Sequence, residues 1–199
     1  MSKITLTPNA AGTATFTVAA PNTSTDRTLT LPDTSETLVA QGTALTLGTA
    51  VASTSGTAID FTGIPAWAKR VTVMFNGVST SGTNSILIQL GSGAVQTSGY
   101  LTYSSKMGNA SVSNGQNYTS GFGISTTSAA YITSGSAAFS TFGSNAWTGN
   151  GFFADSSGGN GFPLGGVVSL SGALDRIRIT TVGGTDTFDA GSINIMYEG

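Results

Sequence analysis

Residues 70–76 read RVTVMFN, and the alternation in this stretch decides the fold class. Every second side chain is apolar, at Val71, Val73 and Phe75, whereas Arg, Thr, Met and Asn occupy the positions between them. Successive side chains of a β-strand point to opposite faces, so the pattern predicts a strand with one buried face.

The same period of two recurs in neighbouring segments. The other side chains that it places in the core are Ile59, Phe61, Ile86, Ile88, Leu90, Ile177, Ile179, Ile193, Ile195 and Tyr197. Leu87 and Gln89 are expected on the outward face of their strand, and residues 174–199 are expected to form a hairpin with a long connection. With Gly-rich turns between the strands, residues 45–199 predict an antiparallel β-sandwich, jelly-roll-like, as a head domain.

The composition of the 199 residues agrees with an all-β protein and limits its partners. Only 8% of the residues are charged, while 39% are hydrophobic and 28 residues are Gly. The net charge is −2 and only seven residues are Lys or Arg, so a phosphate-binding surface for nucleic acid is not expected. No stretch reaches the roughly 20 apolar residues that span a bilayer, and the N-terminus has no apolar signal region, so neither membrane insertion nor export is expected.

Residues that carry common enzyme chemistry are scarce. The chain has no His and no Cys, which removes Ser-His triads, thiolate nucleophiles and most zinc sites. Asp186 and Asp189 could act as paired carboxylates, but turn positions explain them better; Asp155 in ADSSGGNG lacks the acidic neighbours of a calcium loop. We therefore expect no enzyme, no catalytic residue, no cofactor and no metal.

Residues 1–44 contain short alternating runs, KITLTP, TATFTVAAP, RTLTLPD and ETLVAQG, separated by turns. Two or three such strands are marginally stable without a partner surface. One interpretation is a frayed arm on a monomer. The favoured interpretation is that identical segments from several chains pack around an axis.

The middle of the chain carries no charge between Lys106 and Asp155 and is read as weakly patterned strands and long loops. Its aromatic residues are Tyr118, Phe122, Tyr131, Phe139, Phe142, Trp147, Phe152 and Phe153. They either fill the core or form a surface that contacts a partner. Such a surface would resemble adaptable binding loops, in which rings supply rigid contact area and small polar residues supply hydrogen bonds.

Five residues are the candidate receptor contacts: Tyr118, Trp147, Asn150, Phe152 and Phe153. Trp147 lies in SNAWTGNG, whose Asn and Gly residues indicate a turn, so we expect it at or near a loop. A Trp147 in the core is the competing interpretation.

The N-terminal stretches ITLTPNAAGTATFTVAAPN, DRTLTLPD and TLVAQG resemble the N-terminal part of tailed-bacteriophage tail fibre and receptor-binding proteins. Farther along, IDFTGIPAWAKRVTVMFNGVSTSG, IQLGSG, TSGY and DTFDAGSINIMYEG are similar to a β-sandwich of phage tail proteins. The resemblance implies that residues 1–44 are a virion-attachment and trimerisation segment and that residues 45–199 are the head domain.

On this resemblance the protein is expected to be a tail fibre or receptor-binding protein of the virion, made in the host cytoplasm without a signal peptide. Its expected partners are itself as a homotrimer, other phage tail or virion proteins through its N-terminus, and a host surface glycan or protein. The alternative is a virion component that binds no receptor: a head fibre, a capsid decoration protein or a tail-hub adaptor.

Overall fold

The computed structural model describes residues 11, 12, 17, 24, 26, 45–108 and 115–199. The predicted attachment segment, residues 1–44, lies almost wholly outside the described residues, so its role stays a prediction. All regular elements in the described part of the chain are β-strands, which confirms the all-β class. The strands are β1 (Thr46–Leu47), β2 (Val51–Ala52), β3 (Ala58–Thr62), β4 (Arg70–Thr80), β5 (Ile86–Ser92), β6 (Ala94–Val95), β7 (Leu101–Ser104), β8 (Gln116–Tyr118), β9 (Phe122–Ile124), β10 (Thr133–Gly143), β11 (Ala146–Asp155), β12 (Asn160–Ser169), β13 (Arg176–Thr181) and β14 (Phe188–Glu198).

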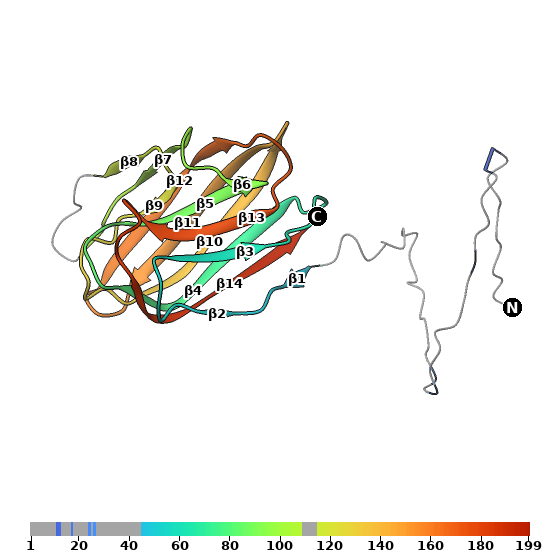
Figure 1. Ribbon diagram of the computed structural model, residues 1–199. Helices are drawn as coiled ribbons and strands as arrows, with labels where there is room; N and C mark the ends of the chain where they lie inside the picture. The colour runs from blue at the N-terminus through green and yellow to red at the C-terminus, as the bar shows by residue number, and fades with distance from the viewer. Residues whose placement is uncertain (1–10, 13–16, 18–23, 25, 27–44, 109–114) are drawn as a thin grey trace, which may run out of the picture. The chain divides into compact units, whose positions relative to one another are not determined.

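The strands form two antiparallel sheets. The large sheet has nine strands, in the order β1-β14-β4-β10-β11-β12-β7-β8, with β2 also paired to β14. The small sheet has five, in the order β3-β13-β5-β6, with β9 also paired to β5. In Figure 1 the strands β3, β13 and β5 lie in front of β4, β10 and β11, so the domain has two layers.

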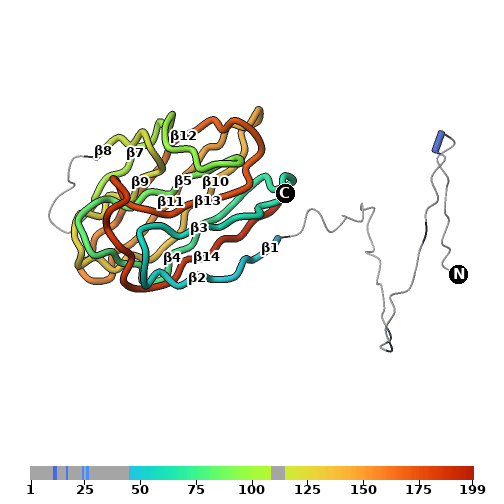
Figure 2. Tube along the Cα trace, viewed as in Figure 1, coloured from blue at the N-terminus to red at the C-terminus, as the bar shows by residue number. Residues whose placement is uncertain are grey.

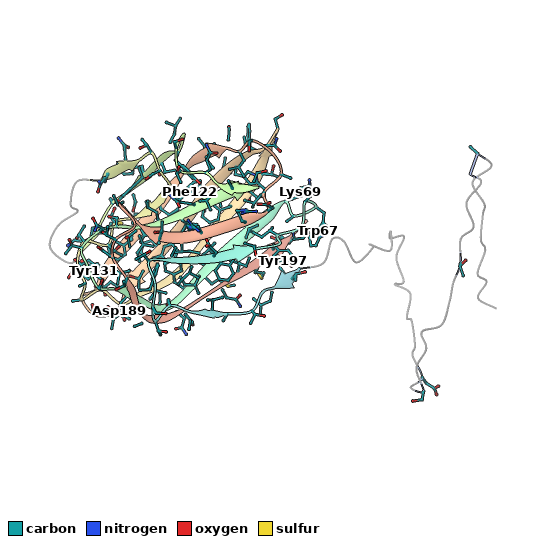
Figure 3. The ribbon with its side chains drawn as sticks, viewed as in Figure 1. Trp67, Lys69, Phe122, Tyr131, Asp189 and Tyr197 are labelled. Atoms are coloured by element: carbon teal, nitrogen blue, oxygen red, sulfur yellow. The ribbon has the colours of Figure 1, made fainter. Side chains whose placement is uncertain are left out.

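One hydrophobic core draws residues from both sheets. The side chains of Val71, Val73 and Phe75 on β4 are buried, which confirms the alternation that decided the fold class. Aromatic rings join the layers: the ring centroids of Phe122 and Phe139 are 4.8 Å apart in a T-shaped pair. Figure 3 shows Phe122 inside the domain. Edge-to-face pairs of this kind are favoured by the charge distribution of the rings.

Leu87 and Gln89 lie on the face of β5 that points away from the main core, as predicted, but both side chains are buried and not exposed to solvent. The chain at residues 120–121 packs against them. The Gln89 side-chain amide donates a hydrogen bond of 2.7 Å to the Ser120 carbonyl, and a Cβ at Gly121 would lie 3.1 Å from both side chains. Strand β5 is therefore buried on both faces.

The predicted hairpin at the C-terminus is also wrong, because its two strands lie in different sheets. Strand β13 pairs with β3 and β5, whereas β14 pairs with β4. Figure 2 shows the chain crossing from one layer to the other between them. Alternation identifies the buried face of each strand, but it does not say to which sheet the strand belongs.

The middle of the chain, where it is described, forms long strands rather than long loops. Strands β10, β11 and β12 have 11, 10 and 10 residues. Ser144 and Asn145 join β10 to β11, with φ angles of 48° and 62°, as a tight hairpin turn requires. The pattern was weak because Gly occupies inward positions: a Cβ at Gly149 would lie 2.6 Å from the Phe139 ring and 2.7 Å from the Phe122 ring.

Candidate functional site

Strand β7 has its polar and apolar faces reversed. It reads LTYS, and its apolar side chains, Leu101 and Tyr103, are 74% and 53% exposed. Thr102 and Ser104, which alternate with them, are buried. A strand that covers a hydrophobic core normally buries its apolar side chains and exposes its polar ones, because burial of apolar area is the main favourable term in folding.

Hydrogen bonds of the buried hydroxyl groups fix this orientation. The Thr102 hydroxyl donates to the Gly121 carbonyl at 2.8 Å and lies 3.1 Å from the Tyr118 carbonyl. The Ser104 hydroxyl accepts hydrogen bonds from the Ser125 backbone N–H at 3.3 Å and from the Ser125 hydroxyl at 3.1 Å. Since buried polar groups that lose their partners cost free energy, these contacts keep Thr102 and Ser104 inside and Leu101 and Tyr103 outside.

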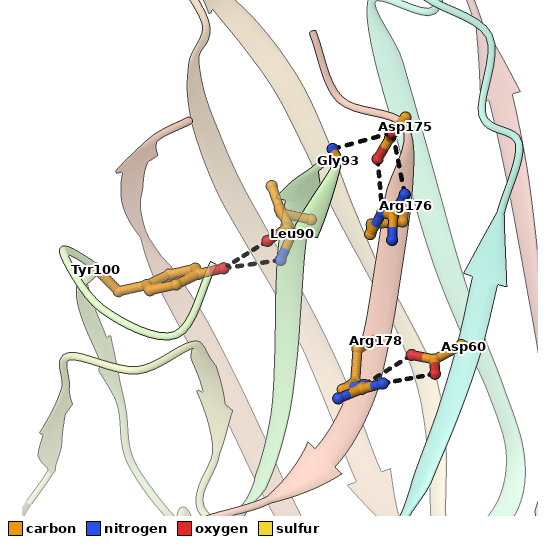
Figure 4. Close-up of polar contacts among 7 residues, drawn as sticks. All are labelled: Asp60, Leu90, Gly93, Tyr100, Asp175, Arg176 and Arg178. Carbon is orange, nitrogen blue, oxygen red and sulfur yellow. Dashed lines mark hydrogen bonds and ion pairs between the residues drawn. The ribbon is translucent and has the colours of Figure 1, made fainter. Parts of the chain in front are cut away.

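The residue before β7 is anchored in the core. Tyr100 is buried, and its hydroxyl accepts a hydrogen bond of 2.8 Å from the Leu90 backbone N–H and lies 3.2 Å from the Leu90 carbonyl (Figure 4). Burial raises the pKa of Tyr100 above its ordinary value, so the ring stays neutral. This contact links the start of β7 in the large sheet to β5 in the small sheet.

Tyr103 lines two hollows beside β7 that are open to solvent. One has a volume of about 450 Å³ and the other of about 400 Å³. The first is lined by Tyr100, Leu101, Thr102, Tyr103, Asn117, Tyr118, Thr119 and Gly165, and the second by Tyr103, Ser105, Pro163, Leu164 and Gly165. None of these lining residues is charged.

Glycines shape the surface around the exposed rings. A Cβ at residue 115 would overlap the Tyr103 hydroxyl and Cζ, so the phenol end of Tyr103 leans across the sheet over Gly115. Gly165 pairs with Tyr103 across β7 and β12 and lines both hollows. A Cβ at Gly161 would lie 2.6 Å from the Phe152 ring, so Phe152 also lies over a glycine.

Two ion pairs next to the small sheet contribute no residue to the lining of these hollows. On the small sheet Arg178 forms an ion pair of 2.7 Å with Asp60, and Arg176 forms one of 2.8 Å with Asp175 (Figure 4). The hydrogen bond from Arg178 lowers the pKa of Asp60 below its ordinary value. Each of these charges is balanced locally, and none of the four residues lines either hollow.

The five predicted contact residues divide between core and surface. Tyr118, Trp147 and Phe153 are buried, and this corrects the expectation that they belong to a contact surface. Trp147 follows the β10–β11 turn, so it does lie near a loop, but its side chain is part of the core. Asn150 and Phe152 are exposed on the outer face of β11. The physical reason is the strand itself: its alternation turns Trp147 and Phe153 inward and Asn150 and Phe152 outward.

The sheet register brings the two exposed residues alongside Tyr103. Asn150 pairs with Gly165, and Gly165 pairs with Tyr103, so all three lie in one row across β11, β12 and β7. Neighbouring strands are about 4.8 Å apart, which puts Asn150 about 10 Å from Tyr103. Phe152 pairs with Pro163, which lines the second hollow. Sequence reasoning missed Tyr103 because its alternation with Thr102 favours an inward ring.

The acidic residues considered for catalysis or calcium have structural roles. Asp155 is buried and accepts hydrogen bonds from the Ser157 hydroxyl at 2.6 Å and the Asn160 amide at 3.0 Å. Burial raises the pKa of Asp155, but these hydrogen bonds outweigh it, and the pKa lies below the ordinary value. Asp186 accepts from the backbone and side chain of Asn84, and Asp189 accepts from the Ser79 hydroxyl.

In the described part of the chain no group of three or more His, Cys, Asp or Glu residues could hold a metal ion. Among the same residues no helix is long and apolar enough to cross a membrane. Comparison with family models, curated proteins and solved structures gives no match for this chain.

Proposed function

We propose that this chain is a structural protein of a tailed-phage virion that attaches to the particle through residues 1–44 and binds the host surface with residues 45–199. The observation that carries the binding role is the reversed strand β7, which exposes Leu101 and Tyr103 beside two hollows whose lining residues carry no charge. Exposed apolar side chains gathered in one patch are typical of interaction sites. The resemblance of residues 1–44 to phage fibre proteins supplies the virion context.

The groups around Tyr103 suit binding. The lining of the two hollows offers the Tyr103 ring on β7, the Asn117 amide on β8 and the hydroxyl groups of Thr119 and Ser105, which follow these strands. Ligand sites combine apolar walls with a few placed polar groups in this way. Because the rings and amides sit on strands and not on loops, the surface is preorganised for its partner.

We further propose that the domain has a jelly-roll-like topology and that the protein is a homotrimer. Three copies of residues 1–44 around an axis would bury the small apolar faces of their short runs and cover exposed strand edges. Light scattering of the full chain at micromolar concentration tests the assembly. The expected result is three times the chain mass of 19.9 kDa, and a stable monomer refutes the trimer.

A second candidate function is a virion component that binds no receptor, and one observation favours it. The outer face of the large sheet carries a run of small side chains, including Thr72, Ser136 and Ala138, beside the exposed aromatic residues. Small side chains allow another protein to approach closely, so this face also suits packing inside a virion. The adsorption experiment below separates the two candidates.

The test compares adsorption of the parent phage to its host with and without an excess of the purified full-length protein. A receptor-binding protein should occupy the receptors and reduce adsorption in proportion to its concentration. Antibody labelling of particles is carried out in parallel. Labelled particles with undiminished adsorption would support the second candidate, and the absence of the protein from particles would refute both.

A further inference from the structure

The surface around Tyr103 combines three properties that narrow its ligand. Its lining residues carry no charge, the exposed Tyr103 ring lines both hollows, and an amide and hydroxyl groups are also part of the lining. An acidic or basic ligand would lose its hydration there without gaining an opposite charge. The chemistry therefore selects a neutral ligand that has both an apolar face and hydroxyl groups.

We propose that this surface, the Tyr103 platform, binds a neutral oligosaccharide with sugar units on either side of the ring; the proposal rests on the host-binding function proposed above. The Tyr103 platform consists of Leu101, Tyr103, Asn117, Thr119, Pro163 and Gly165. The C–H face of a sugar packs on the Tyr103 ring and on Leu101 or Pro163, because aromatic side chains join an apolar body to a polar end.

The sheet register supplies the polar contacts. Asn117 is the direct cross-strand partner of Tyr103, so its amide lies beside the ring and can both donate to and accept from sugar hydroxyls. Directly opposed residues on one face have Cβ atoms about 5 Å apart, which is within the span of one sugar unit. Thr119 adds a hydroxyl at the edge of the first hollow.

The volumes of the two hollows and the glycine that they share also fit this ligand. The hollows, of about 450 and 400 Å³, are in the lower range of small-molecule sites, and both are open to solvent. Gly165 of β12 lines both hollows, and because glycine has no side chain, it places no obstacle between them. A chain of sugars can therefore continue from one hollow to the next past the Tyr103 ring.

Three variants of the full-length protein test the platform. Tyr103→Ala removes the ring. Gly115→Ala introduces a Cβ that displaces the phenol end of Tyr103, and its backbone is outside the left-handed region, so alanine causes no backbone strain. Phe142→Ala is the matched control, because Phe142 is an exposed ring, 81% accessible, that lines neither hollow.

Binding is measured on an array of neutral and acidic oligosaccharides that includes host envelope polysaccharide, followed by titration with the glycan bound best. Wild type should bind neutral glycans and not acidic ones. Tyr103→Ala should weaken the affinity about tenfold, the scale of one lost aromatic contact, and Gly115→Ala should weaken it in the same direction. Phe142→Ala should bind as wild type. Melting temperatures of all three variants should stay near that of wild type.

Several outcomes overturn the proposal: wild type binds no neutral glycan, it binds only acidic glycans, or Tyr103→Ala binds as well as wild type. Loss of cell binding after protease treatment of the host would assign the surface to a protein partner instead. Failure of the platform is distinguishable from failure of the host-binding function. If Tyr103→Ala blocks phage adsorption at the same concentrations as wild type, the platform is wrong and the function stands; if wild type does not block adsorption, the function itself fails.

Discussion

Replacing Trp147 with alanine separates a core role from a contact role for the residue that the sequence left ambiguous. Its side chain is 3% exposed and belongs to the hydrophobic core. It also lines a small hollow of about 70 Å³ that opens at the surface, where the exposed Ala66 and Lys69 lie beside the buried Ala68. Deleting the ring therefore removes a buried side chain from the core and leaves a cavity in its place.

The magnitude follows from the size of the deletion. Removing a buried Trp or Phe side chain costs about 3–5 kcal/mol, as the sum of lost burial and the cavity left behind. In proteins of about 150–250 residues, each kcal/mol lowers the melting temperature by roughly 2–4 °C. Trp147→Ala should therefore lower it by about 6–20 °C.

The assay is thermal and urea unfolding followed by far-ultraviolet circular dichroism, since the substitution removes one of two tryptophans and disturbs fluorescence. Phe142→Ala, on the same hairpin, is the control and should melt with wild type because its ring is exposed. Well below its melting temperature, Trp147→Ala should still block phage adsorption. A melting temperature within about 3 °C of wild type, or lost adsorption by the folded variant, would refute the core assignment.

Four further substitutions test the packing and the buried acid. Val73→Asp places an unpaired carboxylate in the core and should cost several kcal/mol, whereas Thr72→Asp on the opposite face should be nearly neutral; equal urea midpoints would contradict the strand orientation. Gly149→Ala forces a methyl group against the Phe139 ring and should cost about 1–3 kcal/mol in thermal melts, and a neutral effect would contradict that close approach. The folded-state pKa of Asp155 lies below its ordinary value of 3.8, so its stabilisation is complete above that value and is lost as the pH falls through the folded pKa. Asp155→Asn should flatten this loss in melts recorded from about pH 6 to pH 2, and an unchanged profile would contradict the hydrogen-bonding role.

The sequence by itself determined the all-β class and the buried faces of the regular strands. In residues 70–76 of β4 each side chain alternates with its immediate neighbours, and the apolar positions at Val71 and Val73 are buried as that alternation requires. This information is local, because the pleat of a strand fixes the direction of each side chain relative to the next.

Only the tertiary structure decided to which sheet a strand belongs. It also decided which polar side chains are buried, because their hydrogen-bond partners are distant in the sequence. Gln89 is buried because its amide meets the Ser120 carbonyl, and Thr102 is buried because its hydroxyl meets the Gly121 carbonyl. That second contact turns Tyr103 outward and creates the candidate site. Partners that are 19 and 31 residues apart leave no periodic signal, so the reversal of β7 follows from hydrogen-bond satisfaction across the fold and not from its own four residues.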